Sequence, residues 1–143
     1  MRKTCFGVMV LGVWSVVLPG FVKAHHGDAG RYIADVTSVT GTVAQFVMVN
    51  PHAFVVLDVA EDGKTTRWTG ELNAPENLTK NFGWTPEATK KWVGSRVTVT
   101  GRRLKSGAPY INLTDRARIV LADGGQEIYR TANFGAPPPA GEK

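Results

Sequence analysis

The chain has 143 residues, enough for one modest domain, and no linker-like stretch divides it. Its formal net charge is +5, but three of the 17 basic residues (Arg2, Lys3 and Lys23) and none of the 12 acidic ones lie in the first 24 positions. The remainder keeps 14 basic and 12 acidic residues, a charge near +2, which is too small to imply a polyanion partner by itself.

Residues 1–24 have the pattern of a secretory signal peptide. Arg2 and Lys3 precede an apolar run over residues 6–22, and the small residues Val22 and Ala24 stand where a signal peptidase cleaves. We therefore predict cleavage near Ala24 and a periplasmic or secreted protein with no membrane span after cleavage. The alternative is an uncleaved anchor. The only cysteine, Cys5, is in this leader, so the mature chain has no thiol for a disulfide or a metal.

Three strands are predicted in the first half of the mature chain. Residues 36–49 are rich in β-branched side chains, with a bend or bulge expected at Gly41. Asn50-Pro51 ends that run, because proline cannot donate to a β-ladder. A second strand is predicted over residues 53–59 and a third over residues 65–72, joined by a hairpin turn at residues 61–64.

A short helical region is predicted next. Asn73 is the expected cap of a helix that has Pro75 near its first position and stops at Gly83. A second helical turn begins with Thr85 as its cap and ends at Trp92.

Two further strands are predicted, over residues 96–101 and residues 110–121, joined by a turn at residues 105–109. Residues 135–143 have nothing to bury and are predicted to be disordered, which leaves residues 25–134 as a single domain. Three strands, a short helical segment and two strands are the element order of an OB-like, mainly β, five-stranded antiparallel barrel. The alternative is a small antiparallel sandwich.

Several short motifs occur in a fixed order along the chain. They are His25-His26-Gly27, Tyr32, Gly41-Thr42-Val43, Asn50-Pro51-His52, Trp68 followed by Glu71-Leu72, Gly83-Trp84 and the strand at residues 97–101. Through these motifs residues 25–122 resemble an exported bacterial family catalogued as domain-of-unknown-function family 6152. The resemblance implies export and a small β-rich fold, and it implies no established activity.

The histidines are the most specific chemical groups of the mature chain. Cleavage after Ala24 would give His25 a free α-amine, which together with its own Nδ1 can chelate copper(II), and a further imidazole completes a three-nitrogen site. His52 is the better third ligand, because the adjacent side chains of His25 and His26 diverge on an extended chain. The candidate metal ligands are His25, His26 and His52. The alternative is a solvated His-His pair and a hydrogen-bonded loop histidine, without metal.

No motif of a hydrolase or a phosphate-binding loop is present, so we predict a non-enzyme. The carboxylates of Asp58, Glu71, Asp115 and Asp123 lie on different segments and are interpreted as solvated strand and turn residues.

The remaining candidates are contact residues for an unknown envelope protein or small ligand. Arg102 and Arg103 belong to a basic cluster that fits an anionic surface better than nucleic acid, given the predicted export. Trp84, after Gly83, is expected to be partly exposed and so to contact a partner, whereas Phe54 and Trp68 are expected in the core. The sequence therefore predicts a binding or accessory module, with copper as one ligand and a metal-independent interaction face as the alternative.

Overall fold

The computed structural model describes residues 30–141, so the predicted signal peptide, His25 and His26 lie outside the described residues. Within residues 30–141 no helix is both long and apolar enough to cross a membrane. The residues from 135 to 141 form no helix or strand, and the predicted disorder of the tail stays a prediction.

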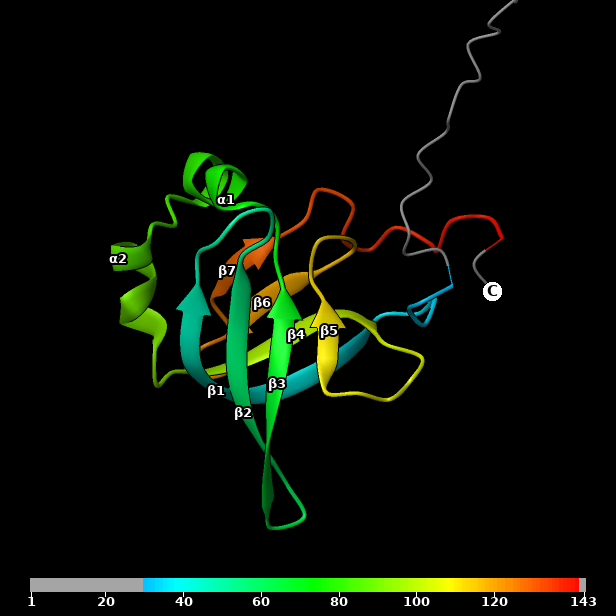
Figure 1. Cartoon of the computed structure of the whole chain (residues 1–143), viewed down its shortest axis with the longest axis horizontal. Helices are drawn as coiled ribbons and strands as arrows, with labels where there is room; N and C mark the ends of the chain where they lie inside the picture. The colour runs from blue at the N-terminus through cyan, green and yellow to red at the C-terminus, as the bar shows by residue number, and fades with distance from the viewer. Residues whose placement is uncertain (1–29, 142–143) are drawn as a thin grey trace, which may run out of the picture.

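Five strands close into a barrel, which confirms the predicted OB-like fold (Figure 1). The strands are β1 (Thr37–Val47), β2 (Phe54–Glu61), β3 (Lys64–Glu71), β4 (Arg96–Arg103) and β5 (Tyr110–Asn112). They are hydrogen-bonded in the order β1-β2-β3-β5-β4, and β4 returns to β1. Four of these contacts are antiparallel, and only β3 and β5 run parallel.

β1 serves two partners because it bends around the barrel. Residues 37–42 pair with β4, and residues 42–47 pair with β2. The register shift lies between Val43 and Gln45, not at Gly41, where the bend or bulge was expected. Gly41 has a different role: a Cβ there would lie 2.9 Å from the carbonyl oxygen of Asp58. The predicted hairpin turn between β2 and β3 is confirmed, and both Asp62 and Gly63 have the positive φ that such a tight turn needs.

Three short helices lie between β3 and β4, namely α1 (Pro75–Phe82), α2 (Pro86–Thr89) and the 3-10 helix η1 (Lys90–Trp92). Gly83 ends α1 in the left-handed conformation, and the Thr85 hydroxyl accepts a hydrogen bond from the amide of Ala88, both as predicted. Asn73 does not cap α1. Ala74 occupies the cap position, and the Asn73 amide donates instead to the phenol of Tyr129.

The predicted single strand over residues 110–121 is wrong, because β5 and a separate strand β6 (Arg118–Leu121) share it. Both lie along β4: Arg102 pairs with Asn112, and Thr100 pairs with Arg118. From Thr100 to Arg102 the strand β4 advances by two positions, whereas the segment that pairs with it advances by six, from Asn112 to Arg118. The four extra residues between β5 and β6 therefore loop out. β7 (Glu127–Arg130), which the sequence analysis did not predict, pairs with β6 and buries Ile128 and Tyr129.

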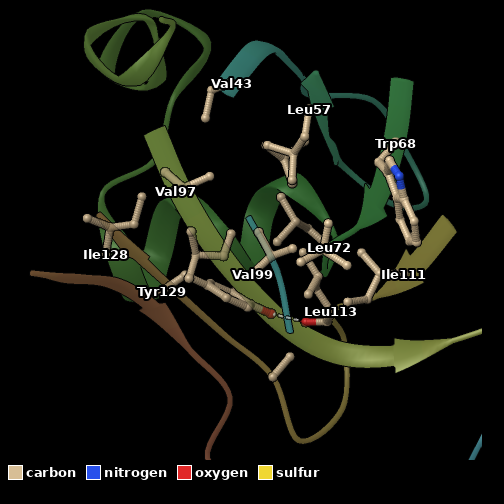
Figure 2. Close-up of a cluster of buried hydrophobic side chains, with 14 of the residues drawn as sticks. Val43, Leu57, Trp68, Leu72, Val97, Val99, Ile111, Leu113, Ile128 and Tyr129 are labelled. Atoms are coloured by element: carbon tan, nitrogen blue, oxygen red, sulfur yellow. Dashed lines mark hydrogen bonds between the residues drawn. The ribbon is translucent and has the colours of Figure 1, made fainter. Parts of the chain in front are cut away.

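The core fills the barrel and continues under α1 (Figure 2). Alternate residues of β2 point inward (Val55, Leu57 and Val59), and Trp68 joins them from β3 as predicted. Phe54 is in the opposite phase of the strand and is only partly buried, so its predicted core position is wrong.

Candidate functional site

His52 lies in the loop between β1 and β2, where two acceptors face its Nδ1. This nitrogen is 3.1 Å from the carbonyl oxygen of Leu72 and 3.1 Å from Oε1 of Glu71. A carbonyl oxygen can only accept, so Nδ1 carries the proton of this hydrogen bond, and in the neutral imidazole Nε2 has the free lone pair. The side chain is 40% exposed, and within residues 30–141 no hydrogen bond involves Nε2. His52 therefore has a fixed ring and a free nitrogen that faces away from its hydrogen-bonding partners.

Glu71 connects His52 to two tyrosines. Its Oε2 accepts hydrogen bonds from the phenols of Tyr110, on the neighbouring strand β5, and of Tyr32, 3.4 Å away. The Glu71 side chain is only 18% exposed, so its interpretation as a solvated strand residue is wrong. Burial, and next the hydrogen bond to Glu71, raise the pKa of Tyr110 well above its usual range. We call these four residues the His52–Glu71 cluster.

The described chain begins beside this cluster. The amide of Ile33 donates to the carbonyl of Arg103, and the amide of Lys105 donates to the carbonyl of Arg31, so both main-chain bonds hold this segment against the end of β4. They fix Tyr32, whose ring is buried. The first described residues, Arg31 to Ile33, therefore lie next to the cluster.

The structure does not bring a complete metal-ligand set together in the described chain. Among residues 30–141 no group of three His, Cys, Asp or Glu side chains could hold a metal ion. His52 is the only one of the three predicted ligands in that range, and Glu71 faces its Nδ1 and not its Nε2.

The two predicted arginine contacts have structural partners. Arg102 is 8% exposed; its guanidinium donates to the carbonyl of Ile33 and lies 3.5 Å from the Asp115 carboxylate. Arg103 lies over the ring of Trp68, with 4.5 Å between its guanidinium carbon and the ring centre. Arg102 thus links β4 to the segments at Ile33 and Asp115, and Arg103 links β4 to β3. Arg103 is the more exposed of the two side chains.

Trp84 is buried, with 1% of its surface exposed, so its predicted partial exposure is wrong. It is the centre of an aromatic cluster that closes one end of the barrel; the other rings are Phe46, Phe82, Trp92 and Tyr129, with centroids 4.9–6.1 Å from one another or from Trp84. The αL turn at Gly83 directs Trp84 back under α1, where its amide donates to the carbonyl of Leu78.

Residues 15–110 match a family of unknown function, DUF6152, and because the match spans more than half of the sequence, the chain belongs to this family. No curated protein matches the chain. The family membership agrees with the resemblance carried by the short motifs, and it assigns no activity.

The sequence indicated His52 as a candidate but did not indicate Glu71, Tyr110 and Tyr32 as its neighbours. The alternation in β3 and around Tyr110 places Glu71 and Tyr110 on the outer face of the sheet, which was a usable signal. The β3–β5 pairing brings Glu71 and Tyr110 together, although they are 39 positions apart in the sequence.

Proposed function

We propose that this chain is an exported, non-catalytic binding module that holds copper(II) through His52 together with the N-terminal histidines His25 and His26. The observation that carries the proposal is the environment of His52. Histidines that bind a metal usually donate their second ring N–H to a carbonyl or a carboxylate, which fixes the tautomer and aims the free nitrogen. His52 has both acceptors at Nδ1, and its Nε2 is free for a metal.

The N-terminal histidines are within reach of that nitrogen. Tyr32 follows His25 by seven positions, at most about 25 Å of extended chain. The phenol of Tyr32 is 3.4 Å from one oxygen of Glu71, and the other oxygen is 3.1 Å from His52. The α-amine and imidazole of a mature N-terminus can therefore fold over His52, and three nitrogen ligands suit Cu(II), the tightest binder of the divalent series.

The test begins with the intact mass of the protein from a periplasmic extract, followed by a Cu(II) titration against a competing chelator. A form that begins at His25 with one tightly bound copper supports the proposal. We expect His52→Ala to lower the affinity about tenfold or more, since a ligand is lost. One alanine added before His25 should weaken binding as well, because the free amine moves away from the His25 ring.

Glu71→Gln provides a sharper test, because it removes the charge behind His52 and keeps the size of the side chain. We expect about a tenfold loss of copper affinity. Asp58→Asn is the matched control: this carboxylate, also on the outer face of the barrel, pairs with Arg67 and is remote from the cluster. Affinity that is no tighter than that of a peptide with only His25 and His26 would reject the proposal and favour a metal-independent module that uses the barrel face.

A further inference from the structure

A second surface feature lies between α1 and the segment that follows β7. It is a hollow of about 530 Å³, within the usual ~300–1,000 Å³ of small-molecule sites. We call it the asparagine groove; its lining residues are Asn73, Asn77, Asn81, Phe82, Thr114, Arg130, Thr131, Ala132 and Asn133. α1 and β7 lie close together at this end of the barrel (Figure 1), where the rings of Phe82 and Tyr129 are 5.1 Å apart.

The groove concentrates one kind of side chain. The chain has six asparagines, and four of them line this hollow. Asn77 and Asn81 are four residues apart on α1, so both amides lie on the same face of the helix. Both side chains are exposed, and within residues 30–141 neither amide has a hydrogen-bonding partner in the structure. Their donors and acceptors are available to a ligand.

The other two asparagines are held in place. The Asn73 amide nitrogen donates to the Tyr129 phenol, which donates in turn to the carbonyl of Leu113. The oxygen of Asn133 accepts from the amide of Arg116, and its nitrogen donates to Asp115. The groove therefore combines two fixed amides with two free ones, and a fixed polar group costs less entropy to bind than a mobile one.

The chemistry of the lining indicates a hydroxyl-rich ligand. A carboxamide both donates and accepts, as a sugar hydroxyl does, so the free amides of Asn77 and Asn81 can each exchange paired hydrogen bonds with a sugar. Phe82 supplies an apolar surface. Among residues 30–141, Arg130 is the only charged residue that lines the groove, and no carboxylate lines it. A nucleic acid would need more cations along its path. We propose that the asparagine groove binds a short glycan of one to three sugar units, independently of copper.

The experiment follows the asparagine side-chain amide signals of the full mature protein by ¹H–¹⁵N NMR. The probes are maltotriose, triacetylchitotriose and trigalacturonic acid, each up to about 10 mM, with a Gly-Ser peptide as the non-sugar probe. We expect at least one sugar to shift the Asn77 and Asn81 signals in a saturable way. A larger response to trigalacturonic acid would assign a role to Arg130 with acidic sugars.

The double variant Asn77→Ala/Asn81→Ala should weaken sugar binding at least tenfold, and alanine favours the helix, so α1 is retained. The matched control is Glu76→Ala/Lys80→Ala, which changes two exposed residues with the same spacing on α1 that do not line the groove. The proposal is overturned if none of the sugars shifts these signals, if only the peptide does, or if the asparagine variant binds sugar as tightly as the control.

Discussion

Tyr129 is a single residue that connects the core to the asparagine groove, and Figure 2 shows the core side of this connection, its hydrogen bond with Leu113. It is 1% exposed; its phenol donates to the Leu113 carbonyl at 2.7 Å and accepts from Asn73 at 2.9 Å. Burial raises the pKa of Tyr129 to about 12, above the value of about 10 in an unfolded chain. Because the folded state then holds the proton more tightly, the stabilisation is complete below pH 10 and is lost as the pH rises toward 12.

We expect the free energy of unfolding to fall by about 1 kcal/mol between pH 9 and pH 11 through Tyr129 alone. Urea unfolding curves at several pH values measure this, and Tyr129→Phe is the reference, because it removes the titrating group and keeps the ring. All other ionisable groups are the same in both proteins, so the difference in slope isolates Tyr129. Identical slopes for the two proteins would contradict the assignment.

At the same scale, the candidate site could be predicted only in part. His52 was named as a candidate because histidine after Asn-Pro is chemically specific and because few residue types can bind copper, and its role stays a prediction. Glu71 was misjudged, since a carboxylate on a strand is usually solvated, and its two tyrosine donors are each 39 residues away in sequence. Trp84 was misjudged because a glycine after a helix predicts the αL turn but not the direction in which the chain leaves it. Here the turn at Gly83 directs Trp84 inward.

At the scale of elements, the first three strands, the hairpin turn and both helix starts with proline followed from local chemistry. The interruption between β5 and β6 did not, because the apolar alternation continues on both sides of it. It is local side-chain bonding that ends β5: the Asn112 oxygen accepts from both the amide and the hydroxyl of Thr114. Arg116 then adopts a positive φ of 48°, and its guanidinium donates to the Ala34 carbonyl. Such a turn competes with the ladder, and hydrophobic patterning cannot reveal it.

Gly101 tests whether the β4–β5 contact closes the barrel. A Cβ on Gly101 would lie 2.2 Å from the carbonyl oxygen of Asn112 and 2.9 Å from a methyl of Leu113. The first neighbour is backbone, so Gly101→Ala must push β5 away from β4. We expect a loss of about 2–3 kcal/mol of stability in urea unfolding, with amide signals of β3 and β5 shifted by NMR.

Arg96→Ala is the control on the same strand, because Arg96 is exposed, and we expect its effect to stay within about 0.5 kcal/mol. A Gly101→Ala protein as stable as this control would mean that β5 can separate from β4 without cost.

At the scale of the whole molecule, the barrel has one end closed by the aromatic cluster around Trp84 and a surface that carries the His52–Glu71 cluster. The described residues contain no cysteine, so no disulfide supports this arrangement between positions 30 and 141. The stability of the domain must then come from core packing, and the largest fully buried side chain is that of Trp84.

Trp84→Ala therefore decides between a structural and a partner-binding role for this residue. We expect it to cost about 3–5 kcal/mol, because it removes the ring that packs on Phe46, Phe82, Trp92 and Tyr129. That is a large part of the ~5–15 kcal/mol by which most domains are stable, so near-ultraviolet circular dichroism and the urea midpoint should both fall markedly. Trp84→Phe, which keeps a ring in the cluster, should lose less. Unchanged stability of the Trp84→Ala protein would instead favour the partner-binding role that the position of Trp84 after Gly83 first indicated. It would also mean that the aromatic cluster is not what closes this end of the barrel.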